Sequence, residues 1–238
     1  MRRWLSLLLP AALLLSLAAC GVSGEEAAPS GDPPETAVEG TGAAPSANGG
    51  HSDGGTQEGI LVAYFSWADN AVLAEDVDVV TSPSVVAPGN VQQLAGWVRE
   101  ETGGDLVPLR VTDPSPSDWD DCLARANEER GADARPELME NVEDLDQYGT
   151  VFLGYPNWWY GVPMALLTFL EQNDLSGKDV YLFCSHGTGG LARSVELITE
   201  AAPNANISDS IFDCYEEDAA SSEADIKAWV HELGFGLA

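Results

Sequence analysis

The sequence predicts an α/β fold, a doubly wound five-stranded parallel sheet with helices on both faces. Two observations lead to this fold class. Short apolar runs alternate with segments that carry apolar residues at helical spacing, and five such units follow one another from residue 59 onward in a chain of 238 residues. The apolar runs lack the polar alternation of a half-exposed strand, so each predicted strand is buried on both faces, as in a parallel sheet.

The first two units lie between residues 59 and 131. Residues 60–65 form a continuous apolar run, which predicts the first strand. Apolar residues at helical spacing over 91–102 predict a helix with Asn90 as its N-cap and a pair of glycines after its end. The second strand is expected at 105–109 and the second helix at 117–131.

The remaining units continue the alternation. Pro163 suits the first turn of a helix, where its missing N–H costs no hydrogen bond. The expected strands are 150–154, 180–184 and 206–211, and the expected helices are 163–171, 190–201 and 222–234. In such sheets ligands bind beyond the carboxyl ends of the strands, where the strand order reverses. The loops after the first, third and fourth strands are therefore the candidate binding loops.

The N-terminal residues predict an export signal and a tether. Residues 1–19 have a basic start and an interrupted apolar run that is too short for a lasting membrane span. The run ends in Leu-Ala-Ala-Cys, which resembles the lipobox of bacterial lipoproteins and implies lipidation of Cys20; an ordinary cleaved signal with a chance cysteine is the alternative. Residues 20–58 predict a flexible tether, because they bury too little apolar area to offset the entropy of ordering. The folded domain is expected at 59–238.

The charge of the chain excludes two classes of partner. It contains 39 acidic and 10 basic residues, a formal charge of −29. Nucleic acids and anionic lipid surfaces attract Lys and Arg, so neither is expected to bind this protein through charge. The carboxylates at 118–121 and 216–218 predict a solvated acidic surface and no metal site, because a metal ion needs oxygens that converge.

The three candidate loops carry a resemblance to a known family. They contain Tyr-Phe-Ser at 64–66, Tyr-Pro-Asn-Trp-Trp at 155–159 and Cys-Ser-His-Gly-Thr-Gly-Gly at 184–190. Over about residues 59–235 the chain resembles the flavodoxin-like family, and within it the small FMN-binding proteins and NAD(P)H:quinone reductase relatives. The resemblance implies the strand order 2-1-3-4-5 and a noncovalently bound FMN.

The first loop departs from the family pattern, in which one loop rich in hydroxyl groups joins strand one directly to helix one. Here residues 68–87 form an insertion, and we expect a split phosphate loop made of Ser66, Trp67, Gly89, Asn90 and Val91. Amide groups at a helix N-terminus and a serine hydroxyl suit a phosphate. Val91 lacks the hydroxyl of the family's threonine, so Thr81, Ser82 or Ser84 is expected to supply one. The alternative is that the site has decayed and Gly89 only makes a turn.

The other two loops are implied to hold the isoalloxazine. The loop after the third strand consists of Pro156, Asn157, Trp158, Trp159, Tyr160 and Gly161; Trp159 or Tyr160 is expected to offer an aromatic face, and Gly161 to permit a tight turn. The loop after the fourth strand, expected at the pyrimidine edge, consists of Ser185, His186, Gly187, Thr188 and Gly189. His186 is the candidate catalytic residue, because it titrates near neutral pH and can protonate a flavin or quinone oxygen. The alternative for His186 is a local hydrogen bond.

Three cysteines follow Cys20. Cys184 ends the predicted fourth strand and Cys214 follows the predicted fifth, so a disulfide between these neighbours is an open alternative to two free thiols. Cys122 lies on a predicted helix, and we expect it to be buried and free.

Together these features predict a redox protein with FMN, tethered to the outer face of a bacterial membrane. It is expected to pass electrons to a protein partner or to a quinone-like acceptor, and the resemblance leaves open whether it is an NAD(P)H or quinone oxidoreductase or an electron shuttle. The acidic surface favours partners that are basic. The alternative is a flavin-free binding or scaffold lipoprotein that retains the fold.

Overall fold

The computed structural model describes residues 58–75, 77 and 83–236. The predicted export signal, Cys20 and the tether up to residue 57 lie outside the described residues, and so do Thr81 and Ser82 of the predicted insertion.

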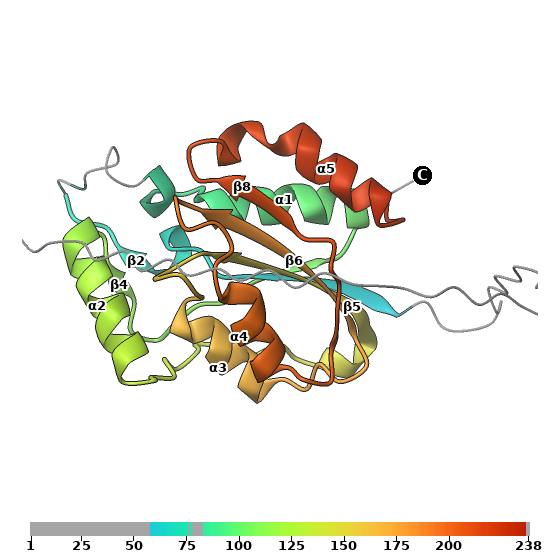
Figure 1. Cartoon of the computed structure of the whole chain (residues 1–238), viewed down its shortest axis with the longest axis horizontal. Coiled ribbons are helices and arrows are strands. Elements are labelled where there is room, and N and C mark those ends of the chain that lie inside the picture. Colours follow the sequence, from blue (N-terminus) through green and yellow to red (C-terminus); the bar gives the residue numbers. More distant parts are fainter. Residues whose placement is uncertain (1–57, 76, 78–82, 237–238) are drawn as a thin grey trace, which may run out of the picture. The chain divides into compact units, whose positions relative to one another are not determined.

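A parallel sheet forms the centre of the domain (Figure 1). Its strands are β1 (Gly59–Tyr64), β3 (Asp105–Pro108), β5 (Tyr148–Pro156), β6 (Asp179–His186), β7 (Asn206–Ile207) and β8 (Phe212–Tyr215). The order is β3-β1-β5-β6-β7, with β8 also paired to β6. If β7 and β8 count as two halves of one position, this is the order 2-1-3-4-5, and the predicted doubly wound sheet is confirmed.

Helices cover both faces of this sheet (Figure 1). Helices α1 (Asn90–Thr102) and α5 (Glu223–Glu232) lie against one face, and α3 (Met164–Gln172) and α4 (Ser194–Ala201) lie against the other. Helix α2 (Trp119–Gly131) packs against α3 and the short strand β4 (Ser115–Pro116). Within the described ranges, none of the helices has the length and apolar content needed to cross a membrane.

The strand residues supply two core layers, because neighbouring side chains of a strand point to opposite faces. Val62, Phe152 and Phe183 pack with α1 and α5 in one layer. Leu61, Leu153 and Leu182 of the same three strands pack with α3 and α4 in the other. The continuous apolar runs of the sequence are explained by this arrangement, since both faces of each strand are covered.

Two predicted boundaries were wrong. The fifth strand, predicted at 206–211, is interrupted, and its second half is β8. Ser208 supplies the interruption, because its side-chain oxygen accepts the Ser210 backbone N–H at 3.1 Å and competes with strand pairing. Helix α4 begins at Ser194 and not at 190, because residues 190–193 form turns in which Ala192 has a positive φ of 42°.

The insertion begins with ordered structure and does not simply loop outward. It contains a short 3-10 helix at Ala68–Asn70 and strand β2 (Ala71–Val72), which pairs with β4 in a second, two-stranded sheet that the sequence did not predict. A second 3-10 turn covers Pro83–Val85. The buried Asn70 side chain donates to the carbonyls of Ser66 and Leu109, and its oxygen accepts the Val111 N–H. The insertion is thereby attached to the ends of β1 and β3.

Candidate functional site

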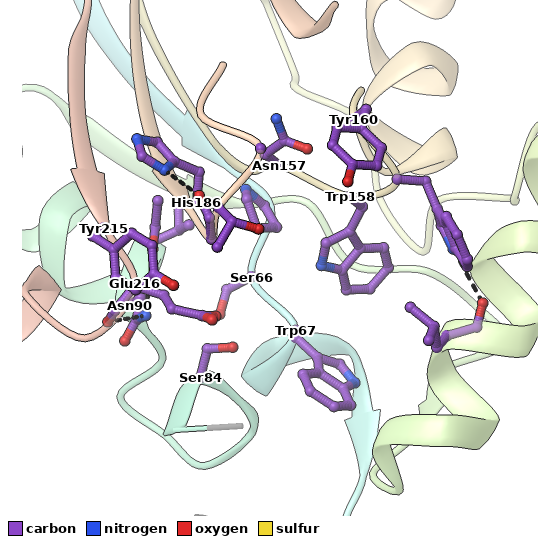
Figure 2. A pocket seen from close by; sticks show the side chains of 18 of the residues that line it. Ser66, Trp67, Ser84, Asn90, Asn157, Trp158, Tyr160, His186, Tyr215 and Glu216 are labelled. Carbon is purple, nitrogen blue, oxygen red and sulfur yellow. Dashed lines mark hydrogen bonds between the residues drawn. The ribbon is translucent and has the colours of Figure 1, made fainter. Parts of the chain in front are cut away.

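A cavity of about 360 Å³ opens at the carboxyl ends of β1, β5 and β6, within the size range of ordinary small-molecule sites. Figure 2 shows its lining side chains, which come from three loops, the N-terminus of α1, α2 and the end of β8. This is where the central strand order reverses, so the position is that expected for a ligand site of a doubly wound sheet.

Most of the residues predicted from the sequence line this cavity. They are Ser66, Trp67, Asn90, Val91, Pro156, Asn157, Trp158, Trp159, Tyr160, Ser185, His186, Gly187, Thr188 and Gly189. Gly89 and Gly161 stand directly beside the lining and shape its loops. The lining residues that the sequence did not single out are Trp119, Leu123, Tyr215 and Glu216, while Ser84 is the one of three proposed hydroxyl donors that the structure describes.

The two halves of the predicted split loop meet at Gly89. A Cβ atom built on Gly89 would lie 2.6 Å from Ser66 Oγ and 2.8 Å from the Ser84 carbonyl oxygen. Gly89 has φ −69° and ψ 164°, a conformation that any residue adopts. The position therefore requires glycine because there is no room for a side chain, and not because of its backbone angles. The insertion therefore leaves Ser66, Ser84 and the start of α1 in direct contact.

The N-terminus of α1 borders the cavity and offers backbone donors to it. The first helical amides, those of Asn90, Val91 and Gln92, have no carbonyl one turn earlier in the helix to bind. The N–H of the N-cap residue Gly89 donates to the side-chain oxygen of Gln92 at 3.2 Å. The positive end of a 13-residue helix and the Ser66 and Ser84 side chains thus surround a space suited to an anion.

Asn90 has a different role from the predicted N-cap. The N-cap of helix α1 is Gly89, one residue before the predicted cap, and Asn90 is the first helical residue. The buried Asn90 side chain donates to the Glu216 carbonyl oxygen at 2.8 Å and to Ser185 Oγ at 3.3 Å. Asn90 therefore ties α1 to the loops that follow β6 and β8, and fixes the geometry of the cavity where these three elements meet.

The loop after β5 makes a tight turn at residues 158–161. Trp158 and Gly161 form an antiparallel bridge, and the Gly161 N–H donates to the Trp158 carbonyl at 2.9 Å. The residues with positive φ are Trp159 at 51° and Tyr160 at 59°. Gly161 suits the turn through space, since a Cβ there would lie 2.9 Å from Leu197 Cδ1, and not through a positive φ of its own. A turn with two positive φ angles favours Asn and Gly, so two aromatic residues in it are strained.

Contacts from α2 hold Trp159 in this conformation. Its indole N–H donates to the Leu123 carbonyl at 3.1 Å, and the Arg130 guanidinium lies 5.3 Å from the ring centroid. Arg130 also donates to the Trp159 carbonyl at 3.4 Å. Tyr160 by contrast is 63% exposed, and its ring packs over Gly189. Of the two residues expected to offer an aromatic face, Trp159 is turned toward α2 and Tyr160 stands at the rim.

Tryptophans form the apolar part of the cavity. Trp158 packs edge-on against Phe65 and Trp67, with ring centroids 5.4 and 6.4 Å apart. Trp67 is buried and donates its indole N–H to the Pro116 carbonyl at 3.1 Å, while Trp119 tilts against it at 6.0 Å. These edge-on and tilted contacts fix an apolar wall of tryptophans on one side of the cavity (Figure 2).

The loop after β6 lies against the loop after β5. The Asn157 N–H donates to the Ser185 carbonyl at 2.9 Å, and the Asn157 side chain donates to the Gly190 carbonyl. The turn from Gly187 to Gly190 is closed by a backbone hydrogen bond of 3.2 Å. The predicted second and third loops therefore form one continuous border of the cavity.

His186 is held by two acceptors. Its Nδ1 lies 2.8 Å from the Gly187 carbonyl, and its Nε2 lies 2.8 Å from the Asp213 carboxylate. Both bonds form at once only when both ring nitrogens carry protons. Because the two nitrogens are occupied, the geometry favours the local hydrogen-bonding role for His186 over the predicted role as a proton donor to a ligand.

The end of β8 contributes Tyr215 and the residue after it, Glu216, which the sequence analysis placed on a solvated acidic surface. Glu216 is partly buried in the cavity lining, and its backbone N–H donates to the His186 carbonyl at 2.8 Å. Burial and the neighbouring Glu217 raise the pKa of its carboxyl, and His186 lowers it. No Lys or Arg belongs to the described lining of this cavity, so Glu216 is its charged group besides a protonated His186.

A second partly buried carboxyl, that of Asp69, lies in the 3-10 helix at the start of the insertion. Asp69 does not line the cavity; it lies 3.7 Å from the Arg110 guanidinium and beside the Tyr64 hydroxyl. Burial raises the pKa of the Asp69 carboxyl, while Tyr64 and Arg110 lower it. Its Oδ2 atom is buried and, among the described residues, without a hydrogen-bond partner.

Cys122, Cys184 and Cys214 are all free thiols. Cys184 pairs in register with Asp213, and Cys214 pairs with Ser185. Residues one step apart along neighbouring strands point to opposite faces of the sheet, which is why the disulfide between Cys184 and Cys214 does not form. The expectation that Cys122 is buried and free is confirmed, and burial raises the pKa of its thiol to about 12.

Another cavity, of about 480 Å³, lies between the ends of α3 and α4, near the amino ends of β6 and β7. It is larger, but it lies at the wrong end of the sheet for this class of fold, and its lining is a run of loop and helix-end residues. Position and convergent chemistry therefore select the first cavity.

Fold and site together define a doubly wound α/β protein with a ligand pocket at its switch point, walled by a helix N-terminus and two aromatic-rich loops. Residues 59–233 match the family model described as flavodoxin, and the chain belongs to that family. No curated protein matches the sequence.

Several solved structures are similar to this chain. A candidate flavoprotein of Bacteroides eggerthii is 26% identical with a TM-score of 0.56, covering 74% of this chain and 98% of its own. A candidate flavoprotein of Bacteroides uniformis is 22% identical with a TM-score of 0.57, covering 73% and 98%. A flavoprotein of Lactobacillus acidophilus in complex with FMN is 17% identical with a TM-score of 0.49, covering 70% and 99%.

The residues present fit the flavin that the family implies. A Cβ at Gly89 would collide with Ser66 Oγ and the Ser84 carbonyl, so glycine lets the Ser66 segment, the Ser84 segment and the start of α1 meet at the cavity, as a phosphate site at a helix N-terminus requires. The tryptophan wall suits a flat aromatic ring system. Backbone groups of the loops at 156–160 and 185–189 border the region between these two parts.

Proposed function

We propose that this protein binds FMN noncovalently and carries electrons on the outer face of a bacterial membrane. The observation that carries the proposal is the convergence, in one cavity, of Ser66 and the α1 N-terminus with the two loops after β5 and β6. Bound FMN would supply the redox chemistry, because its isoalloxazine accepts and returns electrons. The residues of the chain bind it, orient it and exclude water from it.

The phosphate would bind at the Ser66 and Ser84 hydroxyls and at the first amides of α1. The isoalloxazine would lie along the Trp158 wall, with the backbone of 156–160 and 185–189 at its polar edge. His186, bound to Gly187 and Asp213, would hold the second of these loops in place.

The first experiment is the visible spectrum of the purified full-length protein, followed by titration of the flavin-depleted protein with FMN. A yellow protein with tight, stoichiometric FMN binding is the expected result. A colourless protein that binds neither FMN nor riboflavin would contradict the cofactor assignment and favour the flavin-free scaffold lipoprotein.

The electron acceptor is proposed to be a basic protein or a quinone-like molecule. The charge of −29 favours the protein partner, since opposite charges speed encounter and the effect weakens with salt. Stopped-flow oxidation of the reduced protein by a basic c-type cytochrome and by a soluble benzoquinone, at low and high salt, separates the two. A fast, salt-sensitive reaction with the cytochrome supports the shuttle, and a fast, salt-insensitive reaction with the quinone supports the oxidoreductase.

Tethering is proposed to depend on Cys20, which would carry the lipid. We expect the Cys20→Ala variant to leave the membrane fraction or to accumulate as an unprocessed precursor. A processed variant that remains with the membranes would contradict the anchor.

A further inference from the structure

A carboxylate lies in the cavity that is proposed to take a phosphate. Glu216 belongs to the lining, together with Ser66, Ser84 and Asn90 (Figure 2). No Lys or Arg among the described lining residues balances its charge. An anion site usually gathers positive charge or donors, so this acidic side chain needs an explanation.

Backbone hydrogen bonds fix Glu216 next to the helix end. Its carbonyl accepts the Asn90 side chain at 2.8 Å, and Asn90 is the first residue of α1. Its N–H donates to the His186 carbonyl at 2.8 Å. Glu216 Oε1 lies 3.5 Å from the place where a Cβ on Gly187 would be, so the carboxyl is in contact distance of the loop after β6 where both residues line the cavity.

The charged groups near the Glu216 carboxyl are His186 and Glu217. His186 at the end of β6 is the nearby cation when protonated, and it is already bound to Asp213. Glu217 is the adjacent like charge. The α1 residues that border the cavity, Asn90 and Val91, and Ser84 of the insertion carry no charge. Burial and Glu217 together raise the pKa of the Glu216 carboxyl, so its proton is exchanged nearer to neutral pH than that of an exposed glutamate.

We infer that Glu216 is the specificity-determining residue that couples phosphate binding in this cavity to the uptake of a proton. The inference rests on the proposed function, because the phosphate in question is that of FMN. An ionised Glu216 repels the phosphate, whereas a protonated Glu216 has no charge and can donate a hydrogen bond to a phosphate oxygen. FMN therefore binds more tightly as the pH falls, and riboflavin, which has no phosphate, binds with little dependence on Glu216.

The test compares two glutamate-to-glutamine variants of the full-length protein. Glu216→Gln removes the charge inside the cavity and keeps the backbone hydrogen bonds. Glu217→Gln removes an equal charge from the next residue, which is exposed and does not line the cavity. The dissociation constants of FMN and riboflavin are measured by flavin fluorescence for both variants and the wild type from acid to mildly alkaline pH. The phosphate's own ionisation, with a pKa of about 6, cancels in the wild-type to variant ratio for FMN.

We expect the wild-type to Glu216→Gln ratio of FMN dissociation constants to rise from about 1 in acid to about 10 or more in alkali, as removing a repulsion of about 1.4 kcal/mol would give. For riboflavin the ratio stays near 1. Glu217→Gln keeps the pH dependence of FMN binding seen in the wild type, displaced toward lower pH, because it removes the like charge that raises the pKa of the Glu216 carboxyl. If both flavins bind and the two variants give the same FMN profile, the inference is overturned while the proposed function stands. If FMN binding by the wild type shows no more pH dependence than the phosphate's ionisation supplies, the inference is likewise overturned. If neither flavin binds the wild type, the proposed function fails and the inference fails with it.

Discussion

Two glycines of helix α1 allow the geometry of the split phosphate loop to be tested with one pair of variants. Gly89 stands at the N-cap of the helix, and Gly96 lies inside it. A Cβ at Gly89 would come within 3.0 Å of Ser66 Oγ and the Ser84 carbonyl, and a Cβ at Gly96 would meet nothing within 4 Å. Both positions have backbone angles that alanine adopts. Gly89→Ala therefore puts a methyl group where there is no space, whereas Gly96→Ala puts one inside the helix where nothing opposes it.

The expected effects on stability have opposite signs. Filling the contact at Gly89 forces α1 away from the Ser66 and Ser84 segments, and overpacking of this kind costs about 1–3 kcal/mol. Gly96→Ala stabilises the helix by about 0.5–1 kcal/mol, because alanine has the higher helix propensity. For a domain of this size about 2–4 °C corresponds to each kcal/mol, so the melting temperatures should differ by about 3–16 °C. Differential scanning calorimetry of the full-length variants measures this difference.

The same pair tests the proposed cofactor site. Displacing α1 separates its first amides from the Ser66 hydroxyl, and loss of one hydrogen bond to a charged group costs about 1.5–3 kcal/mol. FMN binding by Gly89→Ala should therefore weaken by about 10- to 150-fold relative to Gly96→Ala. Riboflavin binding should change much less. Melting temperatures that agree within a degree would refute the close packing at Gly89, and equal losses for FMN and riboflavin would refute the placement of a phosphate there.

Three further predictions follow from the described side chains. Tyr160→Asn should raise the free energy of unfolding by about 0.5–1 kcal/mol, because Tyr160 is exposed and asparagine tolerates its positive φ. Trp159→Asn should lower the free energy of unfolding, because it removes the contacts with Leu123 and Arg130. Urea denaturation measures both changes, and two changes of the same sign would contradict the prediction. Burial raises the pKa of the Asp69 carboxyl, so the stability that its protonated form contributes is complete below the ordinary pKa near 4 and is lost as the pH rises through the folded-state pKa. The free energy of unfolding of Asp69→Asn should therefore fall less over this pH range than that of the wild type. An equal fall in both proteins would show that Asp69 is not its cause. Alkylation of the denatured protein should label Cys122, Cys184 and Cys214 equally with and without prior reduction, and a mass difference between the two samples would reveal a disulfide.

The sequence predicts the fold well where one physical pattern dominates. The apolar runs of β1, β5 and β6 admit one interpretation, because a strand buried on both faces cannot carry alternating polar residues. The prediction was wrong where a side chain competes with the backbone. Ser208 interrupts the fifth strand through a hydrogen bond to Ser210, a local choice that hydrophobic periodicity does not encode.

The candidate site was predictable in its loops and less so in its supports. The glycines, tryptophans and serines at the strand ends identify the border of the cavity, since a parallel sheet brings its carboxyl ends together. Trp119 and Leu123 enter it from α2, whose position depends on the small sheet of β2 and β4. Two-residue strands leave almost no periodic signal, so this wall could not have been predicted from the sequence alone.

The position of Glu216 in the cavity was also not predictable from the sequence. In the sequence it is the first of three consecutive acidic residues, and such a run is normally solvated. In the structure β8 extends far enough along β6 to pair Tyr215 with His186. This register brings the next residue, Glu216, to the N-terminus of α1, where its carbonyl accepts the Asn90 side chain. The identical neighbour Glu217 remains exposed. The register of β8 on β6 therefore decides which of the two neighbouring carboxylates lines the cavity.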